Sequence, residues 1–408
     1  MIAAQPILVR IAFCLALAAS VSLLVSIAAS QILTALALAA LLAGGGVLRL
    51  PPVRLPLALF MAATVVSLWL SEDPSAGRPQ IRKFYVFLTL LVVYSAFPRL
   101  DQVRRWLFAT AAVATLSSVL ALAQFVRIAG EARQAGRGFY EYYVADRITG
   151  FMSHWMTFGG QVMIALLMLA AWLAFAPLRR RTIWLVCALV LSAALLLGFT
   201  RGIWLATIAG GVYLVWFRDR RLLLAAPVAL AALLLLAPSP VRDRFTSLFR
   251  PSAQLDSNQH RIVCLRTGWR MIQAHPWFGV GPEHVRIRFQ RYLPADAPNP
   301  LPPGWYGHLH NNVVHLAAER GAPAALAMLW LVGKILWDLL RALRRLAPDA
   351  GERRAVLHGS VSVVIAVMVA GLFEYNLGDS EVLALFLTVV GCGYVAAESD
   401  SAQAGALA

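Results

Sequence analysis

Residues 307–340 read GHLHNNVVHLAAERGAPAALAMLWLVGKILWDLL and join a polar segment directly to an apolar one. The second part, residues 322–340, is almost wholly apolar, and a helix of this length crosses about 30 Å of hydrocarbon. The first part holds three histidines and a glutamate, namely His308, His310, His315 and Glu319. The stretch therefore predicts a cluster of titratable groups at the end of a membrane span.

The composition of the whole chain also indicates a protein that lies in a lipid bilayer. Of its 408 residues, 60% are hydrophobic and only 14% are charged, which is too apolar for a soluble domain. Apolar runs near the length of a membrane helix recur throughout, at 11–29, 31–48, 56–71, 84–98, 105–126, 155–176, 182–199, 202–217, 221–238, 313–336, 355–373 and 380–397. They predict an all-α polytopic membrane protein with about 12 transmembrane helices.

These spans divide the chain into four predicted parts. Residues 1–238 hold the first nine spans, residues 239–312 form a large loop with helices of its own, residues 313–398 hold the last three spans, and residues 399–408 form a tail. The first span follows Arg10 and resembles a secretory signal, but a second span follows almost at once. We therefore expect the first span to be retained.

Arginine-rich short loops predict which ends face the cytoplasm. With twelve spans, such loops fall on one side, at 99–105, 179–181, 218–221 and 341–354. The positive-inside rule makes that side cytoplasmic and places both termini there. The opposite, periplasmic side then carries the connections 72–83, 127–154, 200–201, 239–312 and 374–379. This outer side is also basic, as the net charge of +16 requires, and the long loop can cross the membrane regardless of its charge.

Several common functional classes lack their signature in this sequence. There is no nucleotide phosphate-binding loop, no dinucleotide fingerprint and no long basic tail for nucleic acid. The four cysteines are Cys14, Cys187, Cys264 and Cys392, and only Cys264 lies in a long loop. They predict neither a disulfide framework nor a cysteine metal site.

Basic residues gather at the predicted outer ends of the spans. Arg82 and Lys83 stand where the fourth span begins, and Arg147 and His154 precede the sixth. Arg201 lies in a connection so short that the seventh and eighth spans are almost continuous. Placing an arginine at that depth costs free energy unless its side chain pairs with another group, reaches the membrane–water interface or faces a polar cavity. Arg201 is therefore a candidate functional residue.

The long loop adds an amphipathic helix at 261–273. One apolar stripe runs along it, through Ile262, Leu265, Trp269 and Ile272. Arg261 lies at the edge of the stripe and is predicted to point inward. Arg266 and Arg270 stand one turn apart, where like charges repel mildly unless an anion or a lipid headgroup lies between them.

The histidine-rich stretch allows three interpretations. Asn311 or Asn312 can cap a helix, and Asn311, His315 and Glu319 then share one face at four-residue spacing. A metal site would use His308, His310, His315 and Glu319 as ligands. The second interpretation is purely structural, and the third is a general base, because a neutral imidazole accepts a proton near neutral pH. The arginines nearby favour an anion over a metal cation, and hence the general base.

Arginines beside a histidine suit an anionic, lipid-linked substrate. The guanidinium group binds phosphate with a rigid planar fork and keeps its charge at membrane depth. It would also stabilise a leaving pyrophosphate without a metal. The arrangement therefore predicts glycan transfer from a polyprenyl pyrophosphate to an alcohol.

Three segments carry a family resemblance. TRGIWLA at 200–206, HR followed by TGWRMIQAHPWFGVG between 260 and 281, and HLHNNVVHLAAERG at 308–321 resemble successive motifs of the O-antigen ligase and polymerase superfamily. The resemblance covers about residues 70–395 and is strongest to the bacterial O-antigen ligases. Those ligases transfer O-antigen from undecaprenyl pyrophosphate to lipid A–core at the periplasmic face of the inner membrane.

The resemblance implies a GT-C-like fold and a metal-independent, inverting reaction without a cofactor. It implies that Arg201 and Arg261 are essential and that His310 is the base, with His308 as the second candidate. Lys83, Arg82, Arg147 and Arg266 complete the set expected to bind the donor pyrophosphate together with Arg201 and Arg261.

The sequence also allows functions other than O-antigen ligation. A polymerase of the same superfamily uses the same donor with a growing glycan as acceptor, and a protein O-oligosaccharyltransferase uses a protein acceptor. A lipid-linked glycan flippase is an alternative of another class. It should carry charges in the middle of its spans, whereas the ionisable residues here gather at the outer ends.

Overall fold

The computed structural model describes residues 7–136, 138–225, 258–347 and 350–404, together with positions 231, 235 and 242. These residues form helices and no strands, which confirms the all-α prediction for this part of the chain. The predicted span at 221–238 lies largely outside the described residues.

The α-helices are α1 (Ile7–Ser22), α2 (Ile27–Ala43), α3 (Arg54–Trp69), α4 (Pro74–Arg82), α5 (Leu88–Ala96), α6 (Leu100–Gln134), α7 (Phe139–Ala145), α8 (Trp155–Phe175), α9 (Arg181–Leu197), α10 (Arg201–Asp219), α13 (Asn258–Ala274), α14 (His284–Arg288), α15 (Asn312–Arg320), α16 (Ala322–Arg345), α17 (Gly351–Ala370) and α18 (Ser380–Ala404). Short 3-10 helices are η1 (Lys83–Phe87), η2 (Arg220–Ala225), η3 (Phe289–Tyr292) and η4 (Asn376–Gly378).

Several helices have the length and composition of membrane spans. Among the described residues, α6, α8, α16, α17 and the Ser380–Glu398 part of α18 are long and apolar enough to cross a membrane. Shorter apolar helices are α1, α2, α3 and α9. Large apolar side chains such as Leu116 on α6 and Leu189 on α9 are exposed, as a surface facing lipid requires. These features indicate a multi-pass membrane protein, and the count of twelve spans stays a prediction.

The centre of the bundle is formed by α8, α17 and α18. Most of their side chains are buried, and α17 packs against α8, α10, α16 and α18. Helices α3 and α16 pack together on one side of this centre, and α6 and α9 pack together on the other. Each outer helix therefore has apolar residues on two sides, one packed against the protein core and one exposed on the surface.

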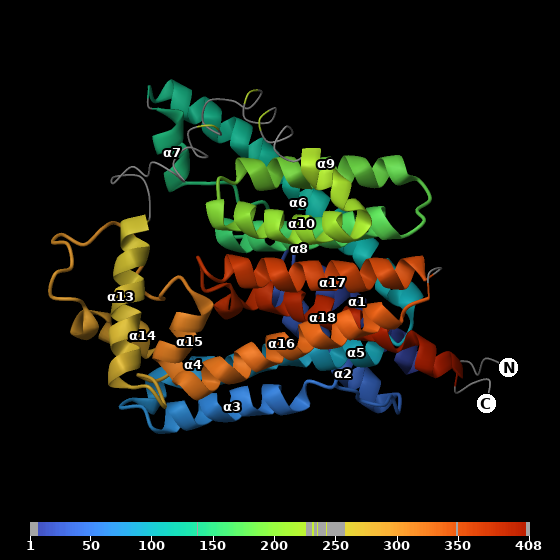
Figure 1. Cartoon of the computed structure of the whole chain (residues 1–408), viewed down its shortest axis with the longest axis horizontal. Helices are drawn as coiled ribbons and strands as arrows, with labels where there is room; N and C mark the ends of the chain where they lie inside the picture. Colours follow the sequence, from blue (N-terminus) through green and yellow to red (C-terminus); the bar gives the residue numbers. More distant parts are fainter. Residues whose placement is uncertain are drawn as a thin grey trace.

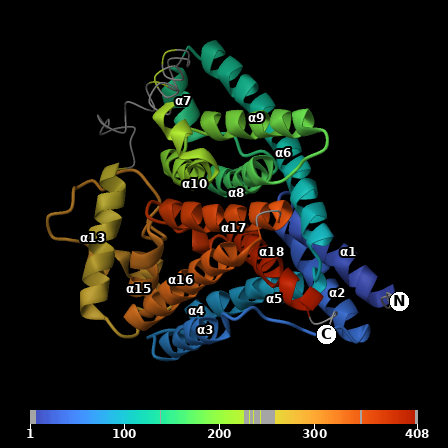
Figure 2. The same cartoon turned by 45° about the vertical axis from the view of Figure 1, so that its right-hand side comes forward.

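The loops gather at two opposite ends of the bundle. Both views place the start of α1 and the end of α18 at one end of the bundle and α13, which runs across the other helices, at the opposite end (Figures 1 and 2). Near the chain ends, Arg104 of α6 pairs with Glu352 of α17 at 2.8 Å. At the α13 end, Arg288 donates to Glu72 at 2.6 Å. Segments assigned to the same side of the membrane from sequence therefore meet in space.

The predicted span at 313–336 is broken into α15 and α16 at Gly321. Gly321 has φ +84°, and a Cβ atom there would lie 2.1 Å from the carbonyl oxygen of Trp277. The backbone N–H groups of Val280 and Gly281 donate to carbonyls at the end of α15, each at 2.9 Å. The turn that follows α13 is thus fixed against the break, which ties the loop region to the bundle.

Helix α6 is longer than the apolar run that predicted it. The run ends at residue 126, but the helix continues to Gln134, 35 residues in all. Its last turns are polar and carry an Arg127–Glu131 ion pair at 3.6 Å, which supports helix beyond the apolar segment. The segment 127–154, predicted as a loop, therefore contains the end of α6 and also α7.

Candidate active site

Two asparagines fix the start of α15 where the histidine-rich segment enters it. The side chain of Asn311 accepts from Val314 N at 3.0 Å, which confirms the predicted helix cap. Asn312 is buried, and its amide donates to Asn376 Oδ1 at 2.7 Å while its Oδ1 accepts from Leu377 N at 3.3 Å. These contacts hold the loop between α17 and α18 against the histidines.

That loop presents Glu374 to two of the predicted histidines. His310 Nδ1 lies 3.1 Å from Glu374 Oε2, and His308 Nε2 lies 3.3 Å from Oε1 of the same carboxylate. The His308 and His310 rings have centroids 4.2 Å apart. Because Glu374 accepts from both, it sets the orientation of both rings. Glu374 was not among the residues predicted from the sequence.

A third histidine comes from α13. The His260 ring centroid lies 4.9 Å from that of His310, and Nε2 of each ring points to the carbonyl oxygen of Trp305, at 3.0 and 3.2 Å. The loop carrying Trp305 therefore holds α13 and the predicted base together.

Burial and the neighbouring charges set the protonation of this group. Burial raises the pKa of Glu374, but the hydrogen bond from His310 and the charges of His310 and His308 outweigh it and lower the pKa to about 2. Burial, reinforced by neighbouring imidazoles, lowers the pKa of His308 to about 4, and the same causes bring His260 to about 4. At neutral pH Glu374 is therefore ionised, while His308 and His260 are neutral.

Three arginines approach the histidines from different elements. Arg201, the first residue of α10, is buried, and its guanidinium donates to Asn258 Oδ1 at 2.9 Å. Arg147 lies with its guanidinium carbon 5.3 Å from the centre of the Trp155 ring. Arg261 is half-buried on α13, as its predicted inward position requires. The structure thus brings together arginines that are far apart in the sequence.

These arginines and histidines line one cavity of about 340 Å³. We call it the arginine cavity, and its titratable lining residues are Arg147, His154, Arg201, His260, Arg261, His308, His310 and Glu374. The N-terminal residues of α8 and α10 also line it, so the positive ends of two helix dipoles face the same space. The cavity is therefore suited to a substrate with several negative charges.

Three other predicted donor-binding residues lie elsewhere. Lys83 lines a second cavity, of about 310 Å³, between α4, α14, α15 and the loop between α17 and α18. Arg82 is exposed and lines neither of these two cavities. Arg266 is exposed on the outer face of α13 and pairs with Asp296 at 2.7 Å. The structure therefore groups Arg147, Arg201 and Arg261 and leaves these three residues apart.

The face of α13 that packs inward is not the apolar stripe noted from sequence. Ile262 and Trp269 of that stripe are largely exposed, whereas Val263, Cys264 and Met271 are buried. The packed face carries His260 and borders Arg261. The helix is thus turned so that His260, rather than Ile262 or Trp269, faces the site.

The four residues considered as metal ligands from sequence separate into two groups. His315 and Glu319 form their own buried pair at 3.4 Å, and Leu309 N donates to the other ring nitrogen of His315 at 3.4 Å. Glu319 also contacts Arg320 at 3.1 Å. This pair stabilises α15 from within, while His308 and His310 belong to the arginine cavity.

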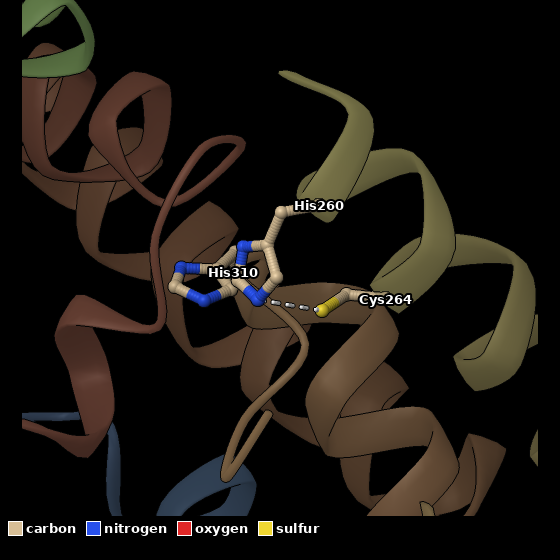
Figure 3. A group of neighbouring side chains, drawn as sticks. All are labelled: His260, Cys264 and His310. Carbon is tan, nitrogen blue, oxygen red and sulfur yellow. Dashed lines mark hydrogen bonds between the residues drawn. The ribbon is translucent and has the colours of Figure 1, made fainter. Parts of the chain in front are cut away.

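Within the described residues, two groups have ligand atoms close enough to hold a metal ion. One is His308, His310 and Glu374, and the other is His260, Cys264 and His310, shown in Figure 3, with the ligand atoms of each group within 4.8 Å of one another. Burial raises the pKa of the Cys264 thiol to about 12, so the thiolate that a metal prefers is disfavoured. The neighbouring arginines also disfavour a cation.

Comparison with known families supports the resemblance stated from sequence. Residues 185–329 match the family described as O-antigen ligase, and this segment contains Arg201, Arg261, His308 and His310. Over this segment the chain is similar to that family, which supports membership of the O-antigen ligase and polymerase superfamily. Comparison with curated proteins gave no match. Members of this family act on lipid-linked polysaccharide, and the segment outside the match supplies Arg147 and Glu374 to the cavity.

Glu374 is expected to orient His310. Glu374→Gln should lower kcat by about 10- to 100-fold, because the carboxylate that holds the His310 ring in position is lost. Glu352→Gln, at the opposite end of the bundle, is the matched control. A kcat of wild-type size in Glu374→Gln, measured with saturating substrates, would remove this role.

Proposed function

We propose that this superfamily member transfers O-antigen from undecaprenyl pyrophosphate to a hydroxyl group of lipid A–core oligosaccharide. The observation that supports it is the arginine cavity, in which Arg147, Arg201 and Arg261 line the same space as His308 and His310. The family match supports a lipid-linked polysaccharide as donor.

The donor diphosphate is assigned to the three arginines. Guanidinium groups bind phosphate oxygens through parallel N–H donors, and they keep their charge in a buried site. The N-termini of α8 and α10 add partial positive charge on the same side. These groups favour the leaving pyrophosphate most as the sugar–phosphate bond breaks and negative charge develops on it.

The reaction is a single displacement at the anomeric carbon. The acceptor hydroxyl oxygen forms a bond to that carbon, and the bond from the carbon to the diphosphate oxygen breaks, its electron pair leaving with undecaprenyl pyrophosphate. The hydroxyl proton passes to a histidine. Attack from the face opposite the leaving group inverts the anomeric configuration.

His310 is the proposed base. Its Nδ1 donates to Glu374, which holds the ring in place and leaves Nε2 as the nitrogen that takes the hydroxyl proton. Nε2 lies 3.2 Å from the carbonyl oxygen of Trp305, so the acceptor hydroxyl would replace that contact. His308 has a pKa of about 4, which makes it a weak proton acceptor at neutral pH. Its Nδ1 is buried and has no hydrogen-bond partner within the described residues, so this nitrogen can accept a hydrogen bond from the acceptor hydroxyl. His308 thus positions the group that His310 deprotonates.

The membrane orientation completes the proposal. The arginine cavity lies at the end of the bundle opposite the chain ends, and the positive-inside rule assigns the chain ends to the cytoplasm. The proposed site therefore faces the periplasm across the bacterial inner membrane, with a GT-C-like helical bundle around it. A glycan donor already activated as a pyrophosphate needs no ATP on that side.

The reaction is proposed to need neither a metal nor another cofactor. Incubation with excess EDTA should leave the transfer rate of the purified protein unchanged, because arginines carry the charge stabilisation that a metal would otherwise supply. Loss of activity with EDTA that zinc restores would assign the histidine groups to a metal instead.

The test of the proposed function is the choice of acceptor. The protein is reconstituted in liposomes with undecaprenyl pyrophosphate-linked O-antigen and either lipid A–core or a second donor molecule. Glycan on lipid A–core supports the ligase. Lengthening of the donor glycan would indicate a polymerase, and movement of intact donor across the bilayer without transfer would indicate a flippase.

A further inference from the structure

The second cavity adjoins the arginine cavity at the proposed catalytic groups. His154, Met156, Trp305, His308 and Glu374 line both spaces. A group in the second cavity therefore also reaches His308 and Glu374, which line the arginine cavity. A displacement reaction requires two substrates at one centre, and two cavities that share these residues can bring them together.

The two cavities differ in charge. Besides the shared Glu374, the second cavity is lined by the carboxylates Glu283, Glu319 and Asp379, whereas the arginine cavity has Glu374 as its one lining carboxylate within the described residues. Negative charges repel a diphosphate, so the second cavity is a poor place for the donor head. Carboxylates accept hydrogen bonds from hydroxyl groups, which suits a sugar.

Several polar groups of the second cavity are already held in fixed positions. Gln80 donates to Glu283 at 2.5 Å, and Asp379 accepts from Thr157 at 2.5 Å and from the backbone of Glu381 at 3.1 Å. Preorganised acceptors of this kind fix the orientation of a small polar ligand at low entropic cost.

An aromatic face stands beside these acceptors. The Trp305 side chain is exposed and lines both cavities. Its position depends on Gly307, because a Cβ atom there would lie 2.3 Å from Trp305 Nε1. A sugar ring presents an apolar C–H face as well as hydroxyl groups, so an indole next to carboxylates matches its chemistry.

We propose that the second cavity is the subsite for the acceptor saccharide. This inference rests on the proposed function. The acceptor sugar packs against Trp305 and donates hydroxyl hydrogen bonds to Glu283 and Asp379, with its reacting hydroxyl group directed to His308. The donor occupies the arginine cavity at the same time.

Two cations define the class of acceptor more closely. Arg286 on α14 and Lys83 at the start of η1 both line the second cavity, and Arg286 is exposed. Lys83 Nζ lies 3.5 Å from the carbonyl oxygen of Gly378, close to the carboxylate side of the cavity. They add hydrogen-bond donors to the carboxylate acceptors, which fits a saccharide whose hydroxyl groups both accept and donate hydrogen bonds.

The test separates the two substrates in the reconstituted full-length protein. Arg286→Ala and Lys83→Gln should each raise KM for lipid A–core by about 10-fold, the loss expected for one charge-assisted contact. The Kd for undecaprenyl pyrophosphate, measured directly on the same preparations, should stay at the wild-type value. Arg291→Ala is the matched control, since Arg291 is exposed five residues further on and lines neither cavity.

An unchanged acceptor KM in both variants overturns the assignment, as does a raised Kd for undecaprenyl pyrophosphate with acceptor KM unaffected. Failure of the proposed function has a different signature. In that case Arg201→Ala and Arg261→Ala would bind undecaprenyl pyrophosphate as the wild type does, whatever the two second-cavity variants show.

Discussion

His310→Ala is expected to lower kcat for glycan transfer by about 10²- to 10⁴-fold, the range associated with loss of a general base. The reason is geometric. His310 is held by Glu374 at 3.1 Å inside the cavity that also contains the three arginines. Without the imidazole, the acceptor hydroxyl has no positioned group to take its proton. The measurement is a single-turnover transfer assay with saturating lipid A–core.

The same variant should keep its donor binding and its fold. The Kd for undecaprenyl pyrophosphate and the thermal unfolding midpoint should match the wild type, because His310 is proposed to act on the acceptor. His275→Ala is the matched control, since His275 bonds to Tyr292 at 2.7 Å and lines neither cavity. A normal transfer rate in His310→Ala, with His308→Ala inactive, would move the base to His308.

Arg201→Ala and Arg261→Ala are expected to lower kcat/KM for the donor by about 100-fold each, the usual size of a lost charge-stabilising donor. Arg201 begins α10 and Arg261 belongs to α13, so the proposed diphosphate would contact arginines from two separate elements. Arg→Lys at either position should recover only part of the loss, because lysine keeps the charge but loses the planar fork.

Arg201 is also structural, so its variant needs a check on folding. Its guanidinium bonds to Asn258 at 2.9 Å and joins α10 to α13. The thermal unfolding midpoint of each variant separates lost folding from lost binding. Arg270→Ala is the matched control on α13, because Arg270 is exposed and donates to Leu293 O at 2.8 Å. Full donor affinity in both arginine variants would contradict the donor assignment.

The length of each apolar run predicted the helices well, because a helix buried in lipid or in the protein core needs apolar residues along its whole length. The runs correspond to helices throughout the described part of the chain, and loops assigned to one side meet at one end. The break at Gly321 was missed because the apolar residues within 313–318 extend the apolar run of α16 across it. It depends on the distant turn around Trp277, a tertiary contact that local pattern does not contain.

The arginines and histidines of the candidate site were predicted because an ionisable residue at a span end stands out against an apolar background. Arg147, Arg201 and Arg261 meet His308 and His310 in one cavity. Lys83 and Arg266 were grouped with them on charge and sidedness alone. Which cavity a basic residue lines depends on helix packing, and for that reason these two lie apart.

Glu374 is a site residue that was not predicted from the sequence. It lies in the short connection 374–379, which was assigned to the same side as the histidines. Its role follows from Asn312, which fixes the loop between α17 and α18 against α15. An acidic residue in a short loop next to a histidine-rich loop is the signal that could have found it.

A structure of the protein with undecaprenyl pyrophosphate bound, determined by electron cryomicroscopy in lipid nanodiscs, tests the central claim most directly. The account predicts the diphosphate between Arg201 and Arg261, with oxygens within hydrogen-bonding distance of both guanidinium groups and next to His310. A diphosphate held instead by Lys83 and Arg286 in the second cavity, or outside both cavities, would contradict it.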